Sequence, residues 1–110
     1  MESTRQSKIS RLIQKELSEL FLMEAKSMPG IILTVSAVRV TSDLSIAYVY
    51  LSVFPSGKGE ELITGINENV KTIRYDLGKR LRHQLRIIPD LKFFLDDSLD
   101  YLEKIDSLLK

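Results

Sequence analysis

Residues 31–54 read IILTVSAVRVTSDLSIAYVYLSVF, two runs rich in β-branched residues that flank a short polar stretch. This composition predicts two antiparallel strands joined by a turn at residues 41–45, where Ser42 and Asp43 are typical turn residues. The second run alternates, and one face carries the apolar residues Ala47, Val49, Leu51 and Val53. The opposite face carries Tyr48, Tyr50 and Ser52. Because the first of these faces is continuously apolar, we expect it to pack against helices.

The stretch before these strands has the pattern of an amphipathic helix. Apolar residues recur every three or four positions between Ile9 and Met28, with charged residues between them. Ser3 and Gln6 have the spacing of a capping box, in which each side chain satisfies a free backbone donor. Pro29-Gly30 is a stop signal, so a helix is predicted over residues 3–28.

Helical periodicity returns at Glu60 and continues towards Ile88-Pro89, which ends it because proline disfavours a helical residue before it. Gly65, Asn67 and Asn69 lower the helix propensity midway and predict a bend near residues 67–71.

Residues 91–95, LKFFL, alternate again and predict a third strand with Leu91, Phe93 and Leu95 on one side. Asp97 or Ser98 is a suitable cap for a last helix over residues 99–109. The order α-β-β-α-α-β, followed by this helix, predicts an α+β domain whose three-stranded sheet is covered by helices on one face.

Length and composition narrow the function classes. A chain of 110 residues suits one domain, and the absence of cysteine excludes disulfides, thiolate chemistry and Cys-based zinc sites. One histidine is too few for a multi-histidine metal site. No apolar run reaches the length of a membrane span, and the first residues, MESTRQSKIS, lack the apolar core of a signal peptide. We therefore expect a cytoplasmic protein without membrane contact.

The net charge of +1 hides one basic segment, since residues 71–86 hold six basic residues and one acidic residue. On a helical wheel one side of this segment carries Lys71, Arg74, Tyr75, Gly78, Lys79, Arg82 and Arg86, while Arg80 points nearer the apolar side. Such a stripe attracts closely spaced phosphates and releases their counterions, and arginine also binds phosphate bidentately. The stripe therefore predicts a nucleic-acid interface, although a merely solvated helix face has the same pattern.

Other groups carry weaker signals. Tyr48, Tyr50 and Phe94 could stack on bases, but aromatic residues at strand spacing are more often core, which we favour. A second basic edge on the first helix, Arg5, Lys8, Arg11 and Lys15, is best explained by solvation. Asp96, Asp97 and Asp100 favour helix capping over a metal or acid–base role, and Asp43 is most simply a turn residue. His83 contributes only surface polarity.

Three stretches together resemble a known family. They are VRVTSDLSIAYVYLS (38–52), IRYDLGKRLRHQLRIIPDL (73–91) and FFLDDS (93–98). Their order and spacing are similar to those of ribosome-binding factor A, from about Ser7 to Ser98. One departure is that the family's Ala-x-Gly kink corresponds here to Asn69, Val70 and Lys71.

The resemblance implies a type II KH-like domain over residues 1–98, in which a kinked helix pair replaces the GxxG loop. The amphipathic helical tail that we expect over residues 99–110 is not covered by the family's pattern. The resemblance also implies a cytoplasmic factor that binds the small (30S) ribosomal subunit and assists late maturation of 16S rRNA, including its 5′ region, and adaptation to cold. A monomer is the simplest assumption for its oligomeric state. The resemblance brings no catalysis, no cofactor, no metal and no small-molecule substrate. The RNA-binding residues expected from the basic stripe are Lys71, Arg74, Gly78, Lys79, Arg82 and Arg86.

Two alternatives remain open. One is a protein–protein adaptor that uses the sheet edge or the acidic terminal helix, whose leucines suit a partner groove. The other is a hydrolase or nuclease, which nothing beyond the aspartate cluster supports.

Overall fold

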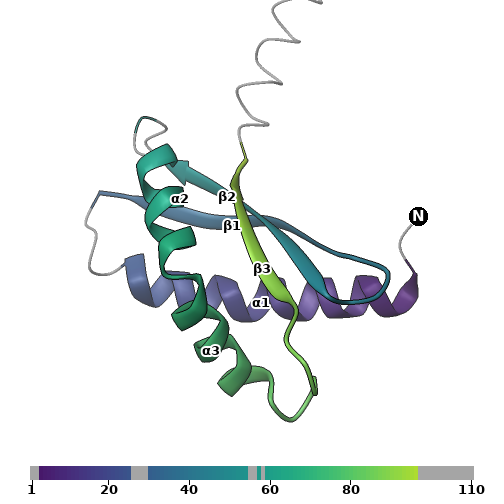
Figure 1. The fold of residues 1–110 in the computed structure, drawn as a ribbon. Helices are drawn as coiled ribbons and strands as arrows, with labels where there is room; N and C mark the ends of the chain where they lie inside the picture. Colours follow the sequence, from purple (N-terminus) through teal and green to yellow (C-terminus); the bar gives the residue numbers. More distant parts are fainter. Residues whose placement is uncertain (1–2, 26–29, 55–56, 58, 97–110) are drawn as a thin grey trace, which may run out of the picture.

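The structure, a computed structural model, describes residues 3–25, 30–54, 57 and 59–96 of the chain. Its helices and strands follow the predicted order (Figure 1) and are α1 (Thr4–Ala25), β1 (Ile32–Val40), β2 (Ile46–Phe54), α2 (Gly59–Glu68), α3 (Val70–Leu81) and β3 (Asp90–Leu95). The predicted terminal helix and the domain boundary after residue 98 lie outside the described residues.

The sheet has the order β1-β2-β3, with β2 in the centre. The first two strands pair antiparallel, as the turn between them predicts. β2 and β3 pair parallel, from Ile46 with Asp90 to Leu51 with Leu95. Since parallel strands require a crossover connection, α2 and α3 together form it. The fold is therefore a mixed three-stranded sheet with a helical crossover.

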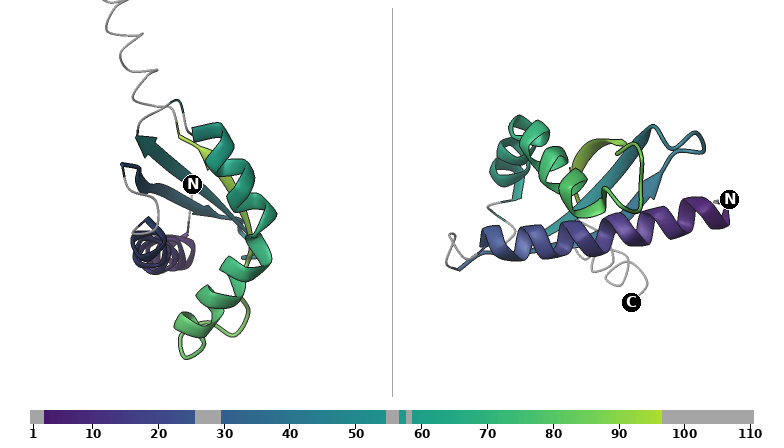
Figure 2. Two further views of the ribbon diagram at one scale, coloured as in Figure 1. Left: turned by 90° about the vertical axis from the view of Figure 1, so that its left-hand side faces the viewer. Right: turned by 90° about the horizontal axis from the view of Figure 1, so that it is seen from below.

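The described helices α1, α2 and α3 lie against one face of this sheet, and the core lies between them and the sheet. Ala47, Val49 and Leu51 of β2 are fully buried, which confirms the predicted apolar face. Opposite them lie fully buried leucines and isoleucine of the helices, namely Ile13 and Leu17 of α1 and Leu77 and Leu81 of α3. Figure 2 shows α1 as one long straight helix and α2–α3 as a bent pair.

α1 begins with the predicted capping box. The backbone amide of Ser3 donates to Oε1 of Gln6 at 2.8 Å, and the amide of Gln6 donates to Oγ of Ser3 at 3.1 Å. The Gln6 side chain also donates to the Val40 carbonyl at 2.9 Å, and Gln14 donates to the Val35 carbonyl at 3.2 Å. These amides hold α1 along β1. The helix is described as far as Ala25, and residues 26–28 of the prediction lie outside the described part.

The predicted bend is confirmed and lies at Asn69, the one residue between α2 and α3. Its backbone amide is shared between the carbonyls of Gly65 at 3.2 Å and Ile66 at 3.1 Å, and its side-chain amide donates to Gly65 at 2.9 Å. With φ of −105° and ψ of 20°, Asn69 leaves the helical region, so the axis bends there. Val70 and Lys71, the other predicted kink positions, are the first residues of α3.

The predicted end of the second helical segment is wrong. α3 stops at Leu81, because the amides of Gln84 and Leu85 both donate to the Leu81 carbonyl at 2.8 Å and the chain turns. This turn lets the half-buried side chains of Leu85 and Ile88 pack against the core. Pro89 sets only the last position that a helix could reach, and tertiary packing ends α3 before it.

Candidate nucleic-acid interface

One side of α3 carries exposed cations in a row. Lys71, Tyr75, Lys79 and Arg82 are exposed and follow each other at three- and four-residue spacing, and we call them the α3 basic flank. The ammonium of Lys79 lies 4.7 Å from the centre of the Tyr75 ring, a cation–π contact that holds both at the surface. In the part of the chain that the structure describes, no carboxylate pairs with Lys71, Lys79 or Arg82. The flank therefore offers three uncompensated charges to an anionic partner.

Arg74 lies at the margin of this flank and already has internal partners. Its guanidinium donates to the carbonyls of Pro89, at 3.2 Å, and Ile88, and lies 3.7 Å from the carboxylate of Asp90. These bonds tie α3 to the segment that leads into β3. With its side chain 43% exposed, Arg74 keeps an open edge, yet its first role is to position α3.

Gly78 lies half-buried on the same helix. A Cβ built there would meet Cγ1 of Ile88 at 3.5 Å, which is ordinary van der Waals contact. No described atom of α1 or of the sheet lies within 4 Å of that Cβ, so close packing against them does not explain this glycine. No atom of the described chain forbids an alanine here.

Arg86 does not share the flank, because it follows the turn that ends α3. Together with Arg5 of α1 and Asp43 of the turn between β1 and β2, it lines a hollow of about 530 Å³. The helical wheel assigned it to the stripe only because the helix was predicted to continue. A contact of Arg86 with RNA therefore requires a partner that also reaches this second surface.

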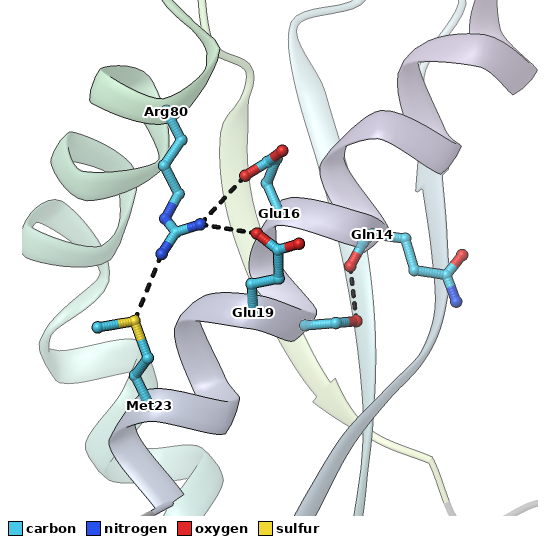
Figure 3. Close-up of polar contacts among 6 residues, drawn as sticks. Gln14, Glu16, Glu19, Met23 and Arg80 are labelled. Carbon is cyan, nitrogen blue, oxygen red and sulfur yellow. Dashed lines mark hydrogen bonds and ion pairs between the residues drawn. The ribbon is translucent and has the colours of Figure 1, made fainter.

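Arg80 points the other way, as the wheel indicates, and joins α3 to α1 (Figure 3). One guanidinium nitrogen lies 3.2 Å from Oε2 of Glu16 and 2.9 Å from Oε2 of Glu19. The other terminal nitrogen lies 3.4 Å from the sulfur of Met23. Because both α1 acids neutralise it, Arg80 adds no free charge to the flank.

Tyr48, Tyr50 and Phe94 are not core residues, which corrects the interpretation favoured from the sequence. Tyr48, Tyr50 and Phe94 lie on the face that the helices leave uncovered, and Phe94 is 42% exposed. The Phe94 ring centre lies 6.0 Å from that of Tyr48 and 5.7 Å from that of Tyr50. The rings therefore pack on one another across the strands, which explains aromatic residues on an open face.

The acidic residues have structural partners. Asp43 accepts hydrogen bonds from the Thr41 hydroxyl and from the amide and hydroxyl of Ser45, and these bonds lower its pKa from 3.8 to about 2. Asp96 accepts a hydrogen bond from the Ser36 hydroxyl. Asp97 and Asp100 lie outside the described residues. Within the ranges that the structure describes, no three acidic or histidine side chains gather into a metal site.

The family model for ribosome-binding factor A matches residues 5–109. The chain belongs to the ribosome-binding factor A family. It is 50% identical to ribosome-binding factor A of Flavobacterium johnsoniae over 111 aligned residues, which span 99% of this chain and 85% of the relative. The corresponding protein of Christiangramia forsetii is 47% identical, with the same coverage.

Solved structures of ribosome-binding factor A share the fold. The crystal structure from Thermus thermophilus superposes with a TM-score of 0.66 at 24% identity, over 82% of this chain and 94% of that one. The solution structure of a putative ribosome-binding factor A from Thermotoga maritima gives 0.67 at 23% identity, over 86% and 89% of the two chains. A Thermus homology model fitted into a map of a complex between the 30S subunit and ribosome-binding factor A gives 0.60. The predicted α+β, KH-like fold class is confirmed.

None of the described helices is long and apolar enough to span a membrane. Sequence reasoning missed the structural roles of Arg74 and Asn67. The Asn67 side chain bonds the backbone of Phe93 in β3, whereas the sequence showed only its low helix propensity. No local signal reveals such a role, because its partner lies 26 residues away.

Proposed function

We propose that the protein is a non-enzymatic assembly factor that binds the small ribosomal subunit through the α3 basic flank. Its family membership and the fitted 30S complex of the Thermus relative support this partner. In this proposal it acts in the cytoplasm as a monomer. It assists late maturation of 16S rRNA, including the 5′ region, and growth in the cold.

The observation that carries the proposal is that some cations of α3 have partners within the protein and the others are exposed together. Arg80 is neutralised by two carboxylates and Arg74 is bonded to backbone carbonyls. The cations without an acidic partner in the described chain, Lys71, Lys79 and Arg82, are gathered on one exposed side of the helix. An exposed row of cations attracts closely spaced backbone phosphates and binds them without any reaction. The exposed Tyr75 ring adds a surface on which a base can stack.

The direct test is co-sedimentation with small subunits across a salt series. The triple variant Lys71→Glu, Lys79→Glu, Arg82→Glu should lose most binding, and its log–log salt slope should fall by about 2. The matched control reverses Lys8, Arg11 and Lys15 on α1, which changes the net charge equally on another exposed surface. Equal loss in both variants, or no loss in either, would contradict binding through the flank.

The maturation step has its own readout. Cells that carry only the flank variant should accumulate 16S precursors with unprocessed 5′ ends and should grow poorly at low temperature. Primer extension on rRNA from cells that carry the α1 control gives the comparison. Normal 5′ processing in cells where the flank variant no longer binds subunits would contradict the maturation role and leave the binding proposal intact.

The adaptor alternative through the sheet edge finds less support. The Asn67 side chain forms hydrogen bonds with the backbone amide and carbonyl of Phe93 in the outer strand β3. Gln6 and Gln14 donate hydrogen bonds to backbone carbonyls of β1. An added strand needs these groups free.

A further inference from the structure

An apolar groove of about 610 Å³ lies where the bent pair α2–α3 faces the end of α1 and the start of β1. Its apolar lining comes from all four elements and the residue before β1 and comprises Phe21, Ile31, Leu33, Leu62, Ile66 and Ile73. Phe21 and Ile66 are buried beneath it, while Ile31, Leu33, Leu62 and Ile73 are only half-buried. The volume lies within the range of sites that take a ligand or several anchoring side chains.

Gly65 forms part of the wall of this groove. Glycine inside a helix is destabilising relative to alanine, and neither the backbone conformation nor a close neighbour requires glycine at position 65. It has no positive φ, and a Cβ built there would meet no atom within 4 Å. The position therefore lowers the stability of α2 and leaves the groove wide, which is what an incoming side chain requires.

The polar rim of the groove is acidic. Glu24, Glu61 and Asp76 line it, and none of its described lining residues is basic. An acidic rim repels nucleic acid, so this surface and the α3 basic flank suit opposite kinds of partner. The chain's own residues 97–110 hold four acidic and two basic residues and match the rim poorly. Charge complementarity favours a basic occupant.

We propose that the groove binds an amphipathic helical segment of a partner protein, with large apolar side chains on one face and lysine or arginine beside them. The apolar side chains enter between Leu62 and Ile73, over Gly65, and the cations meet Glu61 and Asp76. This is the helix-in-groove mode of recognition, in which anchors recur at i, i+3, i+4 and i+7. The inference does not depend on binding of the ribosomal subunit.

The test uses a fluorescein-labelled peptide of about 14 residues, with leucine at the anchor positions and lysine elsewhere, and a counterpart in which glutamate replaces lysine. Fluorescence anisotropy with the intact protein should show binding of the lysine peptide and little binding of the glutamate peptide. Amide shifts in ¹H–¹⁵N spectra should cluster on Leu62, Gly65 and Ile73.

Two substitutions locate the site. A Cβ at position 65 meets no atom within 4 Å, so Gly65→Leu should extend into the groove, raise Tm by a few degrees and weaken binding of the lysine peptide at least about tenfold. The matched control, Thr64→Leu, adds the same side chain at the neighbouring exposed position of α2 and should bind normally. Because the variant gains stability, its loss of binding cannot be attributed to unfolding.

The charge part has a separate reversal. The double variant Glu61→Lys, Asp76→Lys should bind the glutamate peptide more tightly than the lysine peptide. The control Glu68→Lys, outside the groove, should keep the preference for the lysine peptide. Unchanged binding of the lysine peptide to Gly65→Leu would overturn the proposal. A persisting preference of the doubly reversed variant for the lysine peptide would overturn it as well.

Discussion

The carboxamide of Asn67 bonds the backbone of Phe93 in both directions. Its Nδ2 donates to the Phe93 carbonyl at 3.2 Å, and the Phe93 amide donates to its Oδ1 at 3.3 Å. A side chain of α2 thereby acts as the missing neighbour of an outer strand, and it satisfies groups that would otherwise remain unpaired at the edge. The contact also fixes α2, and with it the bend at Asn69, relative to the sheet.

Replacing Asn67 should therefore destabilise the whole fold. Asn67→Leu leaves both partly buried backbone groups of Phe93 without a partner, and we expect a loss of about 1–3 kcal/mol in the free energy of unfolding. Urea denaturation measures it, with Glu68→Leu at the neighbouring exposed position as control. A loss equal to that of the control would show that the two bonds contribute nothing.

Substitutions at the adjacent residues Arg80 and Lys79 should have different effects, on stability at Arg80 and on subunit binding at Lys79. Arg80→Met removes a half-buried cation and leaves Glu16, whose side chain is only 17% exposed, without its partner. We expect a loss of about 1–3 kcal/mol in unfolding free energy with subunit binding kept. Lys79→Met should weaken subunit binding and leave the free energy of unfolding nearly unchanged. Denaturation and co-sedimentation of both variants give the comparison, and a binding defect in Arg80→Met at a temperature where it is fully folded would count against the assignment.

Gly78→Ala should stabilise α3 by about 0.5–1 kcal/mol, because its Cβ makes only ordinary contact with Ile88 and alanine favours the helix. If an RNA backbone approaches α3 closely at Gly78, the same methyl group should weaken subunit binding. Thermal unfolding and co-sedimentation on one preparation report both effects. A stabilised variant with unchanged binding would remove Gly78 from the interface.

Asp43 should titrate with a pKa near 2, since hydrogen bonds from Thr41 and Ser45 stabilise its charged form. A lowered pKa means that the contribution of Asp43 to stability is fully present above the unfolded value of 3.8 and is lost as the pH falls through about 2. Thr41→Val should move the pKa of Asp43 upwards. Carboxyl chemical shifts followed by NMR over a range of roughly pH 1 to pH 6 measure the pKa of Asp43 in the wild type and in the variant. A wild-type pKa near 3.8 would contradict the hydrogen bonds of the turn.

The sequence predicted those parts of the fold that local rules control. The capping box at Ser3, the strand alternation at Val49 and the bend at Asn69 all depend on residues near each other in the chain, and all three are confirmed. The end of α3 was missed because the packing of Leu85 and Ile88, and not a local signal, ends the helix.

The candidate site was predictable only as far as the helical wheel holds. It placed Lys71, Lys79 and Arg82 together, and it separated Arg80 from them. It failed for Arg86, which lies beyond the helix, and it could not show that Arg74 bonds backbone fifteen and fourteen residues further along. The groove was invisible to it, because the angle between α2 and α3 decides whether Leu62 and Ile73 face a common space.

The parallel pairing of β2 with β3 has a consequence for synthesis of the chain. β3 is the last of the described strands, so this three-stranded sheet stays incomplete on a nascent polypeptide until residue 95 has left the exit tunnel. The carbonyls of Ile88 and Pro89 that hold Arg74 arrive only shortly before it. A chain built in this order has a fixed α3 only after residue 95 has emerged.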